Sequence, residues 1–150
     1  MKKITFLFLF LFHLTINSQN IFVGDVVFNT QSQVDNFASE NYDGIDGLLS
    51  VIGLNSINDL SGLASLNSVT GNLTVRISSQ LASLEGLHNI TDVGGDVLIS
   101  ANDILENLNG LRGLQNIGAS LDISFNQVLN DISALNNISS LSGYVRINDN

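Results

Sequence analysis

Residue types that could do chemistry are few and scattered in this sequence. Beyond residue 18 the only histidine is His88, between Leu87 and Ile90, where we expect a solvated turn residue rather than the base of a hydrolytic triad. Asp96 and Asp122 fall on outward positions of short alternating segments, in adjacent columns rather than as a facing pair. A glycosidase needs two carboxyl groups about 5 to 10 Å apart in a cleft. Distance alone leaves an acid pair open, but a smooth repeat face offers no cleft, so we predict no catalytic residue and no enzyme.

Metal and cofactor chemistry has equally little support. The chain contains no cysteine, which removes thiol nucleophiles, thiolate metal ligands and disulfides. Residues 94–97, Gly-Gly-Asp-Val, are similar to a fragment of a calcium-binding nonapeptide repeat, but that repeat needs Gly-Gly-x-Gly-x-Asp in tandem copies. We therefore predict no metal site and no cofactor.

The elements that would position any site repeat every 24 residues. Five segments fall in register at this offset, residues 45–51, 69–75, 93–99, 117–123 and 141–147. Each alternates apolar and outward positions, as in Leu73, Thr74 and Val75. This alternation predicts short strands that stack into a parallel sheet, with neighbouring strands about 4.8 Å apart.

Between these strands aliphatic residues recur every three positions, for example at Leu105, Leu108, Leu111 and Leu114. A period of three fits neither an amphipathic α-helix nor an alternating strand, so we predict an arc of turns. Together with the strand positions, each 24-residue unit then contributes seven aliphatic columns to a shared core. The fold class predicted from this pattern is mainly β, a solenoid of 24-residue turns.

An asparagine column follows the strands at Asn102, Asn126 and Asn150. We expect these amides to point inward and to hydrogen-bond the turn backbone of the neighbouring repeat. The earlier members of the column are Leu54 and Ser78, so the N-terminal repeats are expected to lack this ladder.

The two ends of the solenoid are expected to differ. Residues 19–44 predict an N-terminal cap, with a strand at 26–28 and a short helix that starts at a capping-box spacing from Thr30 to Gln33. Residues 45–150 predict the five-rung solenoid. No polar closing element follows the fifth strand, so we expect a truncated chain or a partner over this edge. The uncapped C-terminal edge is also expected to fray or to support self-association.

The N-terminus predicts export. Lys2 and Lys3 precede an apolar run that is shorter than the about 20 residues needed to span a bilayer, so residues 1–18 are predicted to be a signal peptide. A retained anchor is the alternative. After removal of this segment, three arginines against 14 carboxylates give a formal charge of −11. This charge argues against nucleic acid and anionic lipid as partners, and we expect a secreted or cell-surface protein with no membrane span.

One full repeat carries a family resemblance. It is formed by Leu105, Leu108, Gly110, Leu111, Leu114, Ile117, Ala119, Leu121, Ile123 and Asn126. This pattern resembles the receptor L domain, which includes the ligand-binding L domains of insulin- and growth-factor-type receptors and leucine-rich surface proteins of Gram-negative bacteria. The resemblance covers about residues 21–150. It implies a right-handed, β-helix-like leucine-rich solenoid, extracellular placement and a role in interaction, and it carries over no binding residue.

The outward strand positions are the candidate recognition surface. Tyrosine and arginine are favoured at interaction hot spots, and the predicted partner-binding residues are Arg76, Asp96, Asp122, Tyr144, Arg146 and Asn148. We expect a binding or adhesion module for an extracellular protein or glycan. The alternative is a structural spacer or an accessory domain of a longer secreted protein or enzyme.

Overall fold

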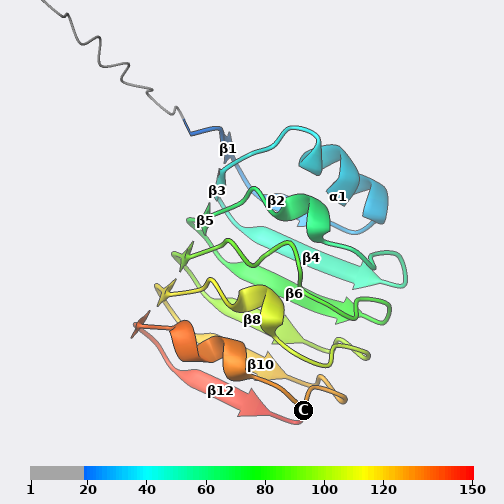
Figure 1. Cartoon of the computed structure of the whole chain (residues 1–150), viewed down its shortest axis with the longest axis vertical. Coiled ribbons are helices and arrows are strands. Elements are labelled where there is room, and N and C mark those ends of the chain that lie inside the picture. The colour runs from blue at the N-terminus through cyan, green and yellow to red at the C-terminus, as the bar shows by residue number, and fades with distance from the viewer. Residues whose placement is uncertain (1–18) are drawn as a thin grey trace, which may run out of the picture.

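The computed structural model describes residues 19–150, and the predicted signal peptide at residues 1–18 lies outside this range. The described chain is mainly β and forms two parallel sheets of six strands each (Figure 1). The first sheet contains β1 (Ile21–Val23), β3 (Gly44–Asp46), β5 (Ser68–Val69), β7 (Asp92–Val93), β9 (Asn116–Ile117) and β11 (Ser140–Leu141). The second contains β2 (Val26–Phe28), β4 (Leu49–Leu54), β6 (Leu73–Ser78), β8 (Val97–Ser100), β10 (Leu121–Ser124) and β12 (Val145–Asn148).

The register confirms the 24-residue repeat. Leu73 pairs with Val97, Val97 with Leu121, and Leu121 with Val145, so equivalent positions lie side by side across the second sheet. The first sheet was not predicted, because its strands from β5 onward have only two residues and so show no alternation that could be recognised. We call one strand of each sheet and the arc that precedes them a rung.

The arcs explain the period of three. Three of them contain 3₁₀ helices, η1 (Ser61–Leu63), η2 (Asn109–Leu111) and η3 (Ser133–Asn137). The amide of Leu111 donates to the carbonyl of Leu108 at 2.8 Å, and the amide of Leu114 donates to that of Leu111 at 2.9 Å. In a 3₁₀ helix residues i and i+3 lie on the same side, so every third side chain faces the core.

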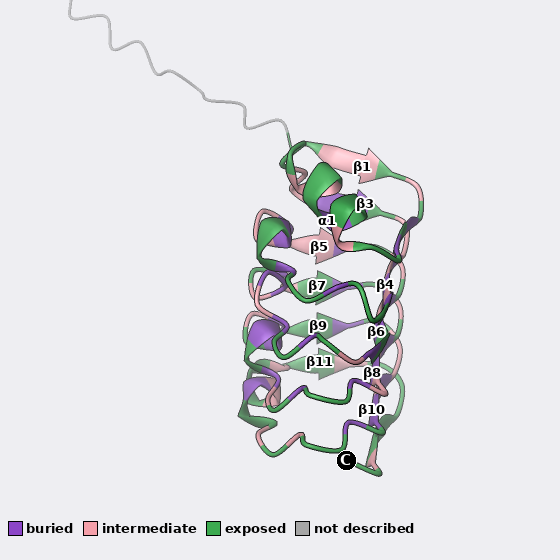
Figure 2. Ribbon diagram, turned by 90° about the vertical axis from the view of Figure 1, so that its right-hand side faces the viewer, coloured by how far each residue is buried: buried purple, intermediate pink, exposed green. Residues whose placement is uncertain are grey.

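Buried aliphatic residues from the strands and the arcs form one core cluster. Figure 2 shows the buried segments of the ribbon in purple along the stack. Leu111 is 1% exposed, as the repeat pattern predicted. The last rung departs from the prediction, because Val145 and Ile147 occupy inward columns but remain 58% and 43% exposed. A rung is buried only by neighbours on both sides, and the described chain supplies no rung beyond β12.

The predicted N-terminal cap is present. Helix α1 (Gln31–Ala38) begins after Thr30, whose hydroxyl accepts from the amide of Gln33 at 3.4 Å, while the Gln33 side chain accepts from the amide of Thr30 at 3.1 Å. Phe37 of α1 packs against Phe22, Phe28 and Tyr42, with ring centroids 5.0 to 5.6 Å apart. This aromatic cluster closes the N-terminal end of the core. Within residues 19–150 no helix combines the length and apolar character needed to cross a membrane.

The asparagine ladder forms as expected, because Asn126 Oδ1 accepts from the turn amide of Asn102 at 3.1 Å and Asn150 Oδ1 accepts from that of Asn126 at 3.1 Å. Each side-chain amide donates to a carbonyl of an earlier rung, Asn102 to Val75 at 3.1 Å and Asn126 to Ile99 at 3.0 Å. The expectation for the N-terminal rungs needs correction, because Ser78 is buried and its hydroxyl accepts from the amide of Gly53 at 3.2 Å. A short hydroxyl thus replaces one of the contacts that an amide makes in later rungs.

Candidate functional site

The outward face of the second sheet is not smooth, contrary to the expectation from the repeat. It contains a small hollow of about 160 Å³, lined by Asp96, Val97, Leu98, Ser120, Asp122 and Tyr144. Three of the six predicted binding residues therefore lie together. They meet because positions 96, 120 and 144 precede β8, β10 and β12, while Leu98 and Asp122 are paired outward positions of β8 and β10.

Tyr144 provides an aromatic surface in this hollow. Its side chain lies on the last rung and is 62% exposed. Leu98 adds a half-buried aliphatic side chain two rungs earlier. An aromatic ring with a hydroxyl can stack on an apolar group and donate a hydrogen bond. The hollow therefore combines apolar contact with polar recognition.

Asp122 is held in place by its neighbours. The Ser124 hydroxyl donates to Asp122 Oδ1 at 2.8 Å, and Arg146 Nη1 lies 3.6 Å from Asp122 Oδ2. The Arg146 Nε donates to Asn148 Oδ1 at 2.8 Å, so Arg146 links two other predicted residues. Arg146 remains half-exposed, and an ion pair with so much water around it contributes about 0 to 1 kcal/mol to stability. Its guanidinium lies at the surface and takes no part in the core.

Asp96 has a structural role that the sequence did not indicate. Its Oδ1 accepts from the amide of Ser120 at 2.8 Å, its own amide donates to Asn72 Oδ1 at 2.8 Å, and the Ser120 hydroxyl accepts from the amide of Tyr144 at 3.3 Å. These residues form an oxygen ladder, in which each side-chain oxygen accepts from the next rung. The signal was present as a column of Asn, Asp and Ser, but it was interpreted only as an outward face.

Arg76 does not join this group. It is exposed on β6, where it pairs in register with Ile52 of β4 and Ser100 of β8. Asn148 occupies the same column three strands further along, on β12. The predicted residues thus form one cluster near the last rungs and one separate arginine.

The arcs carry a second polar group that the sequence did not predict. Glu85 receives a hydrogen bond from Arg112, and its other carboxylate oxygen lies 3.1 Å from His88 Nδ1. The hydrogen bond from Arg112 holds the pKa of Glu85 below its ordinary value of 4.5, against the smaller opposing effect of desolvation. Among the hydrogen bonds of residues 19–150, none joins His88 to a serine or threonine hydroxyl. In this same range no three acidic or histidine side chains are grouped so as to hold a metal ion.

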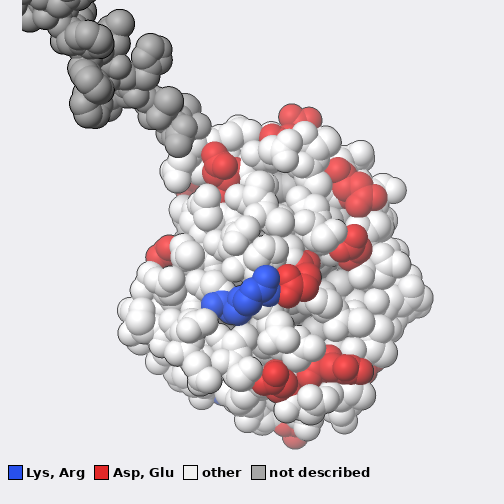
Figure 3. Space-filling view, viewed as in Figure 1, with Lys and Arg blue, Asp and Glu red and all other residues white. Residues whose placement is uncertain are grey.

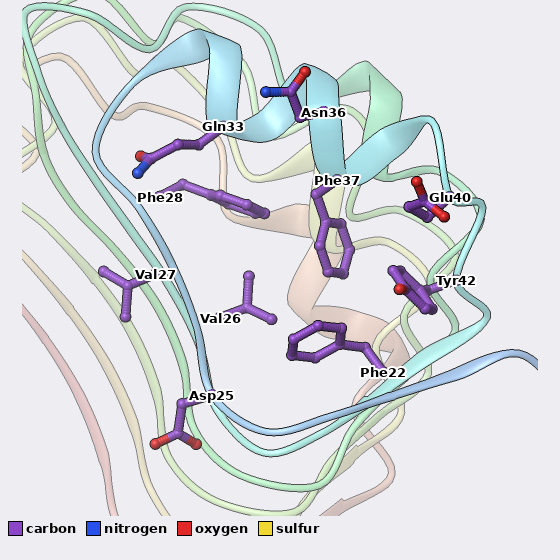
Figure 4. Close-up of a pocket in the computed structure, with 10 residues that line it drawn as sticks. All are labelled: Phe22, Asp25, Val26, Val27, Phe28, Gln33, Asn36, Phe37, Glu40 and Tyr42. Atoms are coloured by element: carbon purple, nitrogen blue, oxygen red, sulfur yellow. The ribbon is translucent and has the colours of Figure 1, made fainter.

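A larger hollow of about 430 Å³ lies at the N-terminal end, between β2 and α1 (Figure 4). The rings of Phe22, Phe37 and Tyr42 lie close together, and Asp25 and Glu40 also line the hollow (Figure 4). None of the predicted binding residues lies here. The rings belong to the aromatic cluster of the cap, so we assign this hollow to the closing of the core.

Acidic side chains dominate the surface of the described chain, which carries three arginines, no lysine and 14 carboxylates. In the view of Figure 3, acids are scattered over the molecule and basic side chains are confined to one small area. Comparisons with protein-family models, curated proteins and solved structures gave no match. A function for this chain therefore has to be argued from its own residues and their geometry.

Proposed function

We propose that the chain is a secreted or cell-surface, non-catalytic binding or adhesion module that holds an extracellular protein or glycan against the outward face of the β4–β12 sheet. The observation that carries this proposal is the hollow that brings Asp96, Asp122 and Tyr144 together beside Arg146. The apolar run near the N-terminus, with its two preceding lysines, supports placement outside the cell.

We further propose that the two sheets belong to a right-handed, β-helix-like leucine-rich solenoid of the receptor L domain type. Support comes from the constant 24-residue register, from the 3₁₀ arcs that separate the strands, and from the helix over one end. Repeat proteins of this kind bind partners on extended surfaces that several rungs build together.

The chemistry of the hollow suits a partner with hydroxyl or cationic groups next to an apolar surface. Tyr144 can stack on a sugar ring or an aliphatic side chain, and Arg146 offers a planar set of donors for carboxylates or hydroxyls. The carboxylate of Asp122 can accept from hydroxyl or ammonium donors. Sugars and protein surfaces both present such groups.

A structural spacer or accessory domain is the second candidate function. The oxygen ladder favours it, because Asn72, Asp96 and Ser120 each use a side-chain oxygen to join neighbouring rungs. In that case the polar residues of the face would serve the stack and solubility rather than a ligand.

The test is a screen of immobilised glycans and extracellular proteins with the wild type and with the double variant Tyr144→Ala/Arg146→Ala. A binder of the face should lose affinity at least about tenfold in the double variant, as hot-spot residues do. The matched control is Arg112→Ala, which removes an exposed arginine on an arc and should leave binding unchanged. A specific binder that tolerates the double variant but is lost with Arg112→Ala or His88→Ala would contradict the proposed site. A screen without any specific binder would favour the spacer.

A further inference from the structure

The corners at the carboxyl ends of the strands of the second sheet, from β4 to β12, share an unusual backbone conformation. One residue at each strand end has a positive φ. Ile77 at 55°, Ala101 at 54°, Phe125 at 58° and Asp149 at 56° recur every 24 residues, whereas Leu54 at 43° lies one position later and pairs in register with Ser78. The left-handed region is unfavourable for residues with a Cβ, and a β-branched residue such as Ile77 is a marked outlier there. Glycine, asparagine and aspartate tolerate it best, as Asp149 illustrates.

Three of these corners also expose large apolar side chains. Leu54, Ile77 and Phe125 are 57%, 45% and 48% exposed. Ile104 and Val128, each three residues after a corner, are exposed as well. A polar residue would fit both the backbone and the water better, so these side chains serve neither local conformation nor the core. Large exposed apolar side chains that gather on neighbouring rungs are typical of a docking surface.

The corners lie one above another along the stack, at the carboxyl ends of the strands of the second sheet (Figure 1). Hydrogen bonds between adjacent rungs hold them there, including the amide of Ser79 to the carbonyl of Leu54 at 3.0 Å and the amide of Phe125 to that of Asn148 at 3.3 Å. We define the corner ridge as Leu54, Ile77, Ala101, Ile104, Phe125 and Val128. It lies at the carboxyl ends of the strands, whereas positions 96, 120 and 144 of the hollow precede the strands.

The spacing between the side chains of the ridge indicates whether a helix or a strand of a partner would fit it. Neighbouring rungs of a sheet are about 4.8 Å apart. An α-helix presents side chains of one stripe about 5 to 6 Å apart, at i, i+3 and i+4, whereas same-face side chains of an extended strand are about 7 Å apart. A helix lying along the stack therefore matches the ridge better than a strand.

The charges beside the ridge indicate which charges a complementary partner helix would carry next to its apolar stripe. Asp103 and Glu106 are exposed close to Ala101 and Ile104 in the chain, and Asp149 continues the corner column. Arg76 precedes Ile77 as the opposing charge. From this apolar ridge and the acidic residues beside it, we propose that the ridge docks an amphipathic helix of a partner protein, with an apolar stripe bordered by lysine or arginine.

The binding test uses a 15-residue leucine–lysine peptide with helical periodicity and one tryptophan on its polar face. The protein has no tryptophan, so fluorescence reports on the peptide alone. We expect residues 19–150 to bind this peptide at least about tenfold more tightly than a twin with glutamate in place of lysine, and than a peptide of the same composition in which leucine and lysine alternate. The proposal would be overturned if either control peptide bound the protein as tightly as the helical leucine–lysine peptide does. The proposal would also be overturned if the protein bound phosphatidylcholine vesicles and showed no preference among the three peptides.

The variant that tests the ridge is Leu54→Asn/Ile77→Asn/Phe125→Asn. Asparagine accepts the left-handed conformation, so the melting temperature should be unchanged or higher, whereas peptide affinity should fall at least about tenfold. Val23→Asn is the matched control, since it removes an exposed aliphatic side chain away from the ridge and should leave affinity unchanged. A triple variant that melts lower than the wild type, or that retains its affinity for the peptide, would show that these side chains serve the fold and would overturn the proposal.

Discussion

The two ends of the stack contain the same aliphatic columns but bury them to different extents. Leu49 and Val51 on β4 are fully buried, whereas Val145 and Ile147, their equivalents on β12, are exposed. At the N-terminal end β2 pairs with β4, and α1 covers the core with its aromatic cluster. At the other end Leu135, Ile138, Leu141 and the two β12 residues line an open hollow of about 370 Å³. Burial in this fold is thus supplied by the next layer and not by the rung itself.

The largest effect that follows from this difference concerns the arc leucines. Leu111→Ala removes a fully buried side chain between two rungs, and the cavity should lower the free energy of unfolding by about 2 to 5 kcal/mol. Leu135→Ala is the matched control, because Leu135 occupies the same column one rung later and is only partly buried. Urea denaturation of both variants should show less than half the loss for Leu135. Equal losses would show that the last rung is packed as tightly as the rung before it.

The asparagine ladder should show the same difference between an inner rung and the last rung, with smaller losses in the free energy of unfolding. Asn126→Ala removes its hydrogen bonds to the amide of Asn102 and to the carbonyl of Ile99, and two such bonds contribute about 1 to 3 kcal/mol together. Asn150→Ala makes the equivalent change at the open end, where water can replace the lost contacts, so its cost should be smaller. Urea denaturation again measures both losses. A larger loss in the free energy of unfolding for Asn150→Ala than for Asn126→Ala would contradict this prediction.

The helix cap can be weakened without touching the core. Thr30→Ala removes the hydroxyl that accepts from the amide of Gln33 at the start of α1, and should cost about 1 kcal/mol. Ser32→Ala, on the exposed side of the same helix, is the control and should be neutral. The measurement is the thermal melt together with helical circular dichroism. If Thr30→Ala leaves both signals unchanged, the capping box contributes nothing to closing this end.

The smallest effect belongs to charges on the arcs. Glu85 has a pKa below 4.5 because Arg112 hydrogen-bonds its carboxylate, so its contribution to stability is present above pH 4.5 and is lost as the pH falls through the lowered pKa. The group is exposed, which limits this contribution to less than about 0.5 kcal/mol. Glu85→Gln should therefore destabilise the protein slightly at pH 7, and the difference from the wild type should shrink as the pH falls through the lowered pKa. A difference that is the same at neutral and acidic pH would mean that packing, not charge, is involved.

The repeat, the long strands, the buried columns and the helix cap could all be predicted from the sequence, because each leaves a periodic or spacing signal. The two-residue strands of the first sheet could not, since Ser68–Val69 is too short to alternate. The sequence placed Asp96 and Asp122 on the outward face, but not the hollow that joins them to Tyr144, because its depth depends on side-chain directions in three adjacent rungs. The left-handed corners, such as Ile77, were also missed, because leucine, isoleucine and phenylalanine give no warning of a positive φ.

Amide hydrogen exchange along the β4–β12 sheet tests most directly whether burial comes from the neighbouring rung. Residues 19–150 should be measured at a concentration where light scattering shows a monomer. Protection should be highest in β6 and β8, which have strands on both sides, and lowest in β12, which lies at the edge of the sheet. Self-association through the open end would raise protection of β12 with concentration. A monomer in which the amides of Val145–Asn148 exchange as slowly as those of Leu73–Ser78 would contradict the account.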